Sequence, residues 1–248
     1  VNVTMSSYPS LVDSSDDYIV NGHGVFLLSS SLLNNNETNS YQISPSFLPG
    51  FLHQQAAFLV ATTPQEFADL WSHRNGGTMQ NQDVVIDLRR AQAALDAGRE
   101  LPNGTVVMCE NFPTLIVCED MTWWLKDGNP WISFDWTYFN ATRQISGAND
   151  PRVIKEGAGF DAFNSTALPP LKRDVLQITD ITTAFYAVRH NNYPNDPMLT
   201  NPGCNQSLSK WVAHNCTNDP FFYTSPFFAI ASRMDLVPRP VPNEDPSS

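Results

Sequence analysis

The chain has 248 residues, 42% of them apolar, and a formal net charge of −11 from 25 acidic and 14 basic side chains. This excess of negative charge repels phosphate backbones, so nucleic acid is excluded as an expected partner. No apolar run approaches the roughly 20 residues that cross a bilayer. The chain also starts at Val1 without a basic segment and apolar run, so we expect a soluble chain whose secretory signal has been removed.

Seven Asn-X-Ser/Thr sequons are spread along the chain, while charged residues make up only 16% of it. A surface kept hydrated by Asn, Ser, Thr and sugar is typical of an extracellular or secretory-pathway protein. The sequence therefore predicts a glycoprotein that is secreted or resides in the secretory-pathway lumen. The predicted carriers of N-linked glycans are Asn2, Asn36, Asn103, Asn140, Asn164, Asn205 and Asn215.

The four cysteines form two pairs that are close in sequence, Cys109 with Cys118 and Cys204 with Cys216. An even number of cysteines in a secreted chain indicates disulfides, and we expect each local pair to be bonded. Zinc ligands normally lie two to four residues apart and are often accompanied by paired histidines, a pattern that is absent here. No metal site is expected.

The ends of the chain differ in composition from its middle. Residues 1–17 are rich in Ser and Asp, and residues 238–248 contain repeated prolines, which lack the backbone donor that a strand ladder needs. We expect a loosely ordered N-terminal segment over 1–17, a single β-rich domain over 18–237 and a flexible Pro-rich tail over 238–248.

Two helices are marked by their ends. Thr63 followed by Pro64 and Glu66 has the pattern of a capping box, and this helix should end before Gly76. A second helix is expected over 87–97, ended by Gly98. Helical spacing also appears over 205–215, inside the loop that the second cysteine pair would close.

Period-two alternation of apolar residues predicts strands over most of the remaining chain. The expected strands cover residues 18–29, 56–61, 105–110, 115–119, 121–126, 131–139, 175–190 and 221–234. The hairpin formed by the third and fourth strands would place Cys109 opposite Cys118. The predicted fold class is mainly β, an antiparallel β barrel or β sandwich with two or three short helices.

Local sequence motifs for common catalytic machinery are absent. The chain has no Gly-rich phosphate loop, no Gly-X-Ser-X-Gly elbow and no His-Glu-X-X-His helix. Nucleotide, flavin and metal cofactors are therefore disfavoured, and we expect none.

Aromatic side chains are concentrated between residues 123 and 139. One interpretation is a buried core, because aromatic residues dominate buried area. The alternative is an aromatic-lined pocket, because alternation along strands would put neighbouring Trp rings on opposite faces. On that alternative, the predicted substrate-binding residues are Trp123, Trp124, Trp131, Trp136, Tyr138 and Tyr186.

His190 and Arg143 are the candidate catalytic residues, because a histidine can exchange protons near neutral pH and an arginine can hold a developing oxyanion. Our first hypothesis is a cofactor-independent, pericyclase-like enzyme. It would bind an apolar or aromatic small molecule in the barrel or sandwich pocket and steer its cyclisation, dehydration or isomerisation.

Two other functions remain open at this stage. Exposed Trp rings would suit a carbohydrate-binding or cell-surface interaction module without catalysis. Paired carboxylates would suit a glycoside hydrolase if two of them lay at the required separation. The candidates for such a pair are Asp87, Glu110, Glu119, Asp120 and Asp135.

Overall fold

The computed structural model describes residues 2–5, 18–43, 48–73, 76–133, 136–150 and 168–188. The chain divides into two compact units, Val1–Lys155 and Glu156–Ser248, and each is described by itself. We predicted a single β-rich domain over residues 18–237. Residue 18 opens a described range and residue 237 lies outside the described residues, so these domain limits stay predictions.

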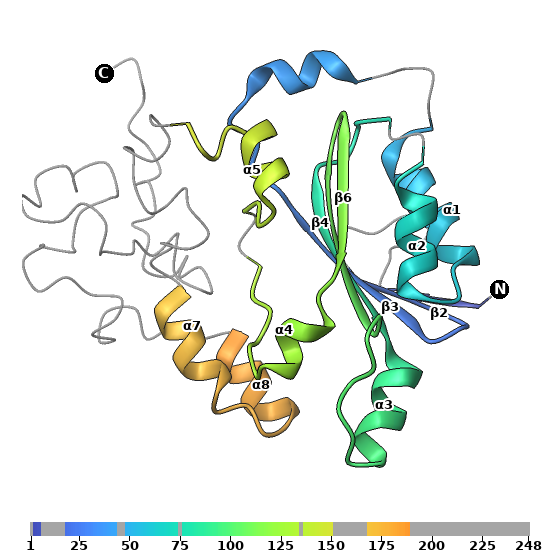
Figure 1. The fold of residues 1–248 in the computed structure, drawn as a ribbon, viewed down its shortest axis with the longest axis vertical. Helices are drawn as coiled ribbons and strands as arrows, with labels where there is room; N and C mark the ends of the chain where they lie inside the picture. Colours follow the sequence, from blue (N-terminus) through green and yellow to red (C-terminus); the bar gives the residue numbers. More distant parts are fainter. Residues whose placement is uncertain are drawn as a thin grey trace, which may run out of the picture. The chain divides into compact units, whose positions relative to one another are not determined.

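Unit 1 is built on one six-stranded antiparallel sheet in the order β1-β2-β3-β4-β5-β6 (Figure 1). The strands are β1 (Val3–Met5), β2 (Tyr18–Asn21), β3 (Val25–Ser31), β4 (Asn81–Asp87), β5 (Val106–Phe112) and β6 (Leu115–Asp120). Each strand pairs with the next one along the chain, so local connections build the whole sheet. The antiparallel, strand-rich fold with short helices is confirmed, although helices contribute enough to make it a mixed fold.

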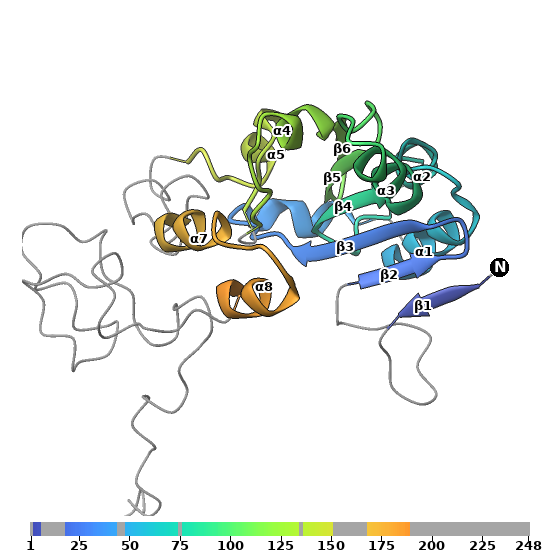
Figure 2. The ribbon, with the colours of Figure 1, turned by 90° about the horizontal axis from the view of Figure 1, so that it is seen from below.

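Helices α1 (Gly50–Val60) and α2 (Pro64–Trp71) cover one face of the sheet (Figures 1 and 2). Phe58, Phe67 and Trp71 of these helices pack against buried strand residues such as Val85 and Val107. This is the larger of the two cores. It buries the side chains that alternate toward the helices along β3, β4 and β5.

The opposite face carries the second core. It is covered by α4 (Thr122–Lys126), by the described residues of 129–133 and 136–139, which are irregular, and by α5 (Asn140–Ile145). Met108, Met121 and Phe139 are its central buried residues. Over β2 and β3 this face is less covered, and Tyr18 and Leu28 are partly exposed there.

The two helices predicted from their ends are confirmed. Thr63 caps α2 by accepting a hydrogen bond from the backbone N–H of Glu66 at 3.1 Å. Asp87 caps α3 (Leu88–Asp96) by accepting from the backbone N–H of Arg90 at 2.9 Å. Both starts depend on short-range contacts that the sequence displays directly. A short 3-10 helix, η1 (Glu37–Gln42), has a similar cap at Asn36.

Three predicted strands are wrong, because residues 56–61, 121–126 and most of 175–190 are helical. Each is a short apolar run that fits a buried strand or a buried helix equally well. The start of α8 is marked by Asp180, which accepts from the backbone N–H of Thr183. The N-cap residue of α4, Met121, makes no side-chain cap. The described residues of 131–139 form an irregular segment and no strand.

In unit 2 the structure describes α7 (Leu168–Val175) and α8 (Ile181–Val188), joined by a short turn. The expected helix 205–215, the Cys204–Cys216 pair and the strand 221–234 lie outside the described residues. Within the described ranges, every helix is too short or too polar to cross a bilayer.

Candidate functional site

A polar run is buried at the start of the central strand β4. Asn81, Gln82 and Asp83 are all buried, and on β5 so are Glu110 and Asn111. Gln82 lies opposite Glu110, and Asp83 lies opposite Cys109. Because side chains alternate along strands, Asn81, Asp83 and Asn111 face the layer of α1 and α2, while Gln82 and Glu110 face α5. Burial of so many polar groups is costly and requires an explanation.

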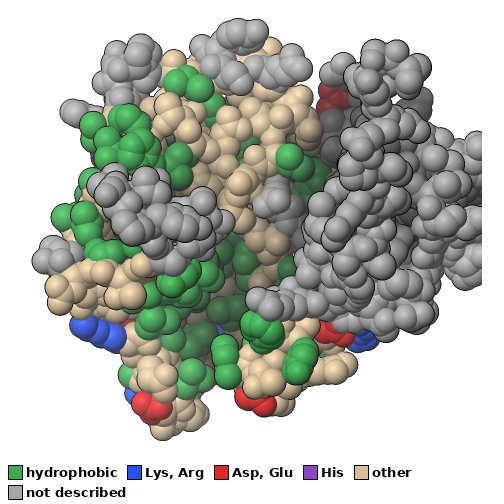
Figure 3. All heavy atoms as spheres, turned by 180° about the vertical axis from the view of Figure 1, so that it is seen from behind, with side chains coloured by type: hydrophobic (Ala, Val, Ile, Leu, Met, Phe, Trp, Pro, Cys, Tyr) green, Lys and Arg blue, Asp and Glu red, His purple; other side chains and the backbone are tan. Residues whose placement is uncertain are grey.

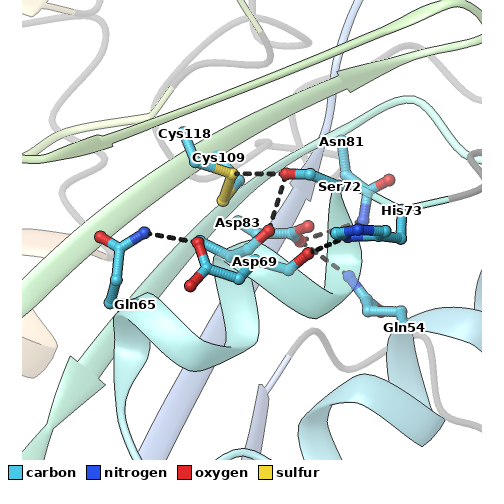
Figure 4. The surroundings of a disulfide bond; sticks show 10 residues. Gln54, Gln65, Asp69, Ser72, His73, Asn81, Asp83, Cys109 and Cys118 are labelled. Atoms are coloured by element: carbon cyan, nitrogen blue, oxygen red, sulfur yellow. Dashed lines mark hydrogen bonds between the residues drawn. A yellow bond between two sulfur atoms is a disulfide. The ribbon is translucent and has the colours of Figure 1, made fainter.

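Asp83 is the centre of the cluster on the helix-covered face. Its Oδ1 atom accepts hydrogen bonds from Ser29 Oγ at 2.7 Å, Gln54 Nε2 at 2.8 Å and Asn81 Nδ2 at 3.1 Å. Asn81 Nδ2 also donates to Ser29 Oγ at 2.8 Å. Figure 4 shows the side chains of Gln54, from α1, and Asn81 pointing toward Asp83. The network thus links α1, β3 and β4 through one carboxyl group.

The buried position of Asp83 changes its acidity. Loss of hydration raises the pKa of this carboxyl from its ordinary value of 3.8 to about 6, although the hydrogen bonds it accepts oppose the rise. The indole N–H of Trp71 also favours the ionised form. Neither Asp83 Oδ2 nor Trp71 Nε1 forms a bond of ordinary geometry within the described residues. Asp83 therefore exchanges its proton in the mildly acidic range.

Asn111 lies on the same face of the neighbouring strand. Both polar atoms of its buried side chain, and the Oδ1 atom of Asn81, have no hydrogen-bond partner in the part of the chain that the structure describes. Buried polar atoms are nearly always paired, so their concentration next to Asp83 marks this end of the sheet as a candidate functional site.

The Cys109–Cys118 disulfide, which the hairpin spacing predicted, forms one border of this cluster (Figure 4). Cys118 Sγ lies 3.8 Å from the hydroxyl of Ser72, which follows α2. On the other side, the His53 ring packs 5.0 Å from the ring of Trp71, and burial lowers the pKa of His53. The network around Asp83 is thus held between α1, α2 and the β5–β6 hairpin.

Glu110 is the second buried acid, and its partners are complete. It accepts from Gln82 Nε2 at 2.7 Å and from the backbone N–H groups of Tyr138 at 2.6 Å and Phe139 at 3.2 Å. It also accepts from the Thr142 hydroxyl. Burial raises the pKa of Glu110, and these donors oppose the rise. Glu110 fastens the start of α5 to the sheet, which is a structural role.

The structure brings together four of the predicted substrate-binding aromatic residues. Trp131 and Tyr138 pack edge to face with ring centroids 5.0 Å apart, Trp124 lies about 6 Å from both, and Trp123 packs on Trp124. The space between Trp124, Trp131 and the sheet is about 10 Å³, enough for roughly one water molecule. Trp124, Trp131 and Tyr138 therefore pack on the second core, whereas Trp123 is 48% exposed, and the substrate-binding role of these residues stays a prediction.

Other predicted site residues lie apart from this cluster. Trp136 is buried in unit 1. Arg143, on α5, donates to Asn149 Oδ1 at 3.3 Å and to the Thr137 carbonyl at 3.4 Å. Tyr186 is exposed on α8 in unit 2, and His190 lies outside the described residues. The catalytic roles of Arg143 and His190 stay predictions.

Four predicted glycosylation sites fall in described ranges. Asn2, Asn103 and Asn140 are exposed, whereas Asn36 is half-buried and donates from Nδ2 to the Ile145 carbonyl at 3.1 Å. The remaining sites, Asn164, Asn205 and Asn215, lie outside the described residues together with Cys204 and Cys216.

Sequence reasoning missed Asp83, Gln54 and Asn111. The available signal was the run Asn81-Gln82-Asp83, placed directly before the apolar residues 84–86. A polar run after two glycines resembles a loop, and only the register of β4 between β3 and β5 shows that it is buried.

Comparison with known proteins gives a consistent result. The family model described as "Phospholipase B" matches residues 1–246. The chain is 28% identical to "Phospholipase B-like 1" of Homo sapiens over 82% of this chain and 36% of that protein. It is 27% identical to "Putative phospholipase B-like 1" of Caenorhabditis elegans, over 93% and 40%. It is 26% identical to "Phospholipase-B 81" of Drysdalia coronoides, over 90% and 38%. The chain thus spans about two fifths or less of these relatives.

These matches overturn the functions expected from the sequence alone. The pericyclase-like cyclase or isomerase, the carbohydrate-binding module and the glycoside hydrolase are all wrong. The first two depended on a pocket or an exposed row of Trp rings, but most of those rings pack against one another. Among the proposed glycosidase carboxylates, Glu110 accepts hydrogen bonds from the backbone of the two residues before α5 and so has a structural role.

Proposed function

Because this chain belongs to the phospholipase B family, we propose that it takes part in hydrolysing the acyl ester bonds of phospholipids. The observation that carries the proposal is the family match over residues 1–246 of the 248. The names of the relatives point to phospholipid substrates. Since the chain spans about a third of the bovine and human relatives, the proposal concerns the part of the reaction that these residues support.

Ester hydrolysis moves protons between the attacking group and the leaving alcohol, and groups that change charge near the working pH support such transfers. Asp83, with a pKa of about 6, is such a group. Because Asp83 is fully buried, it is a positioning residue that acts through its neighbours. When ionised it accepts from Ser29, Gln54 and Asn81; when protonated it must release part of this set.

Ser29 is the half-buried neighbour through which a change in the protonation of Asp83 would reach the solvent-exposed side of the site. Its side chain is half-buried, donates to Asp83 and accepts from Asn81, so its hydroxyl is held in one orientation. A hydroxyl oriented by a carboxylate is an arrangement that acyl-transfer sites use. We assign Ser29 and Asp83 to the site that supports ester hydrolysis.

We also propose that this protein is secreted or resides in the lumen of the secretory pathway. A disulfide forms and persists in oxidising surroundings, and the Cys109–Cys118 bond supports a secreted or lumenal location. Exposed Asn103 and Asn140 can carry N-linked glycans there.

The test measures fatty-acid release from a dissolved short-chain phosphatidylcholine by the purified chain. Ser29→Ala and Asp83→Asn should lower the rate about 10- to 100-fold, because misplacement of reacting groups has effects of that size. Ser30→Ala is the matched control: Ser30 lies next to Ser29, faces away from Asp83 and pairs with Ser133 Oγ at 2.7 Å. Absence of fatty-acid release, or equal rates for the two serine variants, would contradict the proposal.

A further inference from the structure

Trp123 is the exposed member of the aromatic cluster. It is 48% exposed, whereas the other tryptophans of the described ranges are buried or half-buried. Its ring packs edge to face on Trp124, with the ring centroids 5.7 Å apart. A single edge-to-face contact covers only part of an indole, so ring surface of Trp123 stays open to a ligand.

Exposure alone does not identify what covers a side chain on this protein. Hydrophobic side chains also form broad areas on the reverse side of unit 1 (Figure 3). Apolar surface of this kind is common on soluble proteins and selects no partner by itself. Trp123 differs because a predicted glycan carrier, Asn103, is held against the same helix.

The turn that carries Asn103 lies against α4. The ammonium group of Lys126, on α4, donates to Asn103 Oδ1 at 2.6 Å. The backbone N–H of Gly104 donates to Asp120 Oδ2 at 2.7 Å, two residues before α4 begins. Gly104 has a φ of 77°, a left-handed conformation that glycine adopts without strain, so the chain can reverse next to Asn103. Asn103 is thus an exposed residue with a fixed position beside α4.

Lys126 connects this turn to the side of α4 that carries Trp123. Trp123 and Lys126 are three residues apart on the helix, so their Cβ atoms are neighbours about 5–6 Å apart. Trp124 and Leu125 occupy the other side of α4 and pack against the second core. A group attached to Asn103 therefore begins next to the outer side of α4, where the Trp123 ring is exposed.

The contact with Lys126 is compatible with glycosylation of Asn103. It uses the amide oxygen, and Nδ2, the atom that carries an N-linked glycan, forms no hydrogen bond within the described residues. In the attachment reaction Nδ2 loses a proton and bonds to the anomeric carbon of N-acetylglucosamine, which leaves the diphosphate of its lipid carrier. The linked amide keeps its oxygen, so Lys126 can hold the first sugar in place.

We propose that the first sugars of an N-linked glycan on Asn103 stack on the indole ring of Trp123, while Lys126 orients the glycan at its attachment point. The C–H groups on one face of a sugar ring are slightly positive, and the negative face of an indole attracts them. The contact lies within one glycoprotein and involves no foreign carbohydrate. The proposal rests on the secretory-pathway location proposed above, because N-linked glycans are added there.

The first experiment uses the protein secreted from a eukaryotic host. Mass spectrometry of its glycopeptides should find Asn103 occupied. An endoglycosidase should release the Asn103 glycan from native Trp123→Ala about 2- to 10-fold faster than from the native wild type, the change expected for loss of one stacking contact. Asn140, the exposed first residue of α5, is the matched control, and release of its glycan should be equally fast in both proteins.

Quenching of tryptophan fluorescence by acrylamide tests the same contact from the side of the indole. Asn103→Gln should increase quenching relative to the wild type, because the glycan no longer shields Trp123. Asn140→Gln should cause no increase, and neither should Asn103→Gln when Trp123 is also changed to Phe. Because Asn103 and Trp123 are both exposed, these variants leave the two cores of unit 1 intact.

Equal release rates from the wild type and Trp123→Ala, or equal quenching of the wild type and Asn103→Gln, would overturn the stacked glycan. Occupied Asn140 with unoccupied Asn103 would also overturn it and would leave the secretory location standing. A chain without any glycan would overturn the stacked glycan and count against that location. Ester hydrolysis enters none of these measurements, so the proposed function can fail while the stacked glycan is found, and the reverse.

Discussion

Two buried acids lie one residue apart in register on opposite faces of the same sheet, and they differ in how completely they are paired. Glu110 has hydrogen bonds from two backbone N–H groups, an amide and a hydroxyl. Asp83 has three donors on one oxygen, whereas its other oxygen forms no hydrogen bond of ordinary geometry within the described residues, although the Trp71 indole N–H favours the ionised form. Both are fully buried, so burial alone does not distinguish them.

Completeness of pairing separates a structural acid from a functional one. A carboxylate whose lone pairs are satisfied by the backbone holds the fold together, and its charge is part of that arrangement. A carboxyl group with an unpaired oxygen and a pKa near 6 is free to change its protonation. Four predictions test this contrast, in order of decreasing effect.

Glu110→Ala should have the largest effect. It leaves the N–H groups of Tyr138 and Phe139 and the amide of Gln82 buried without an acceptor, so we expect a loss of about 4 kcal/mol in the free energy of unfolding. Urea denaturation of the purified chain measures it. Glu119→Ala, at an exposed position of β6, is the control and should change stability by less than about 0.5 kcal/mol. A loss below about 1 kcal/mol for Glu110→Ala would show that the hydrogen bonds accepted by Glu110 contribute little to stability.

Asp83→Asn should remove a pH dependence. The folded-state pKa is raised, so the carboxyl favours folding fully below pH 3.8, and this contribution disappears as the pH rises through about 6. The rise from 3.8 to about 6 corresponds to about 3 kcal/mol. The stability of the wild type minus that of the variant, measured by denaturation from about one pH unit below 3.8 to about one unit above 6, should fall by that amount. A constant difference would mean that Asp83 titrates normally.

Removal of the disulfide tests whether the hairpin supports the Asp83 side of the sheet. The double variant Cys109→Ala with Cys118→Ala should lose about 2 to 3 kcal/mol of stability, because a cross-link of this kind restricts the unfolded chain. Thermal denaturation with and without reductant gives the value. Reductant should destabilise the wild type by more than the double variant, in which only the predicted Cys204–Cys216 bond could still be reduced.

Ser29→Ala should have the smallest effect on stability. It removes one of the three donors to Asp83 while leaving Gln54 and Asn81, so we expect a loss of about 1 kcal/mol. It should also raise the pKa of Asp83, because a donor to the ionised form is lost. Ser30→Ala serves as the neighbour control, and an equal loss in both variants would remove the special role of Ser29.

The parts of the fold that sequence reasoning predicted are those fixed by short-range contacts. The caps at Thr63 and Asp87 and the cysteine pair of the β5–β6 hairpin all involve residues within about ten positions of each other. Helices α1, α4 and α8 were missed because a short apolar run is compatible with two structures until its tertiary partners are known. In α1 the apolar outer side concealed the helical periodicity altogether.

The candidate site was harder to predict because its contacts are long-range. Asp83 meets Ser29 and Gln54 across 54 and 29 residues of chain. The run from Asn81 to Asp83 is unremarkable as a sequence, and its meaning depends on β4 lying in the middle of the sheet. Most of the aromatic residues between 123 and 139 that stand out in the sequence instead pack in or against the second core, although Trp123 is exposed.

The most direct test of the account is the pH dependence of short-chain phosphatidylcholine hydrolysis by the wild type and by Asp83→Asn. We expect the wild-type rate to show an inflection near pH 6, the value to which burial raises the pKa of Asp83, and the variant to lack it. Ser30→Ala should retain the inflection. Profiles of the same shape for the wild type and Asp83→Asn would contradict the claim that this buried acid governs the site.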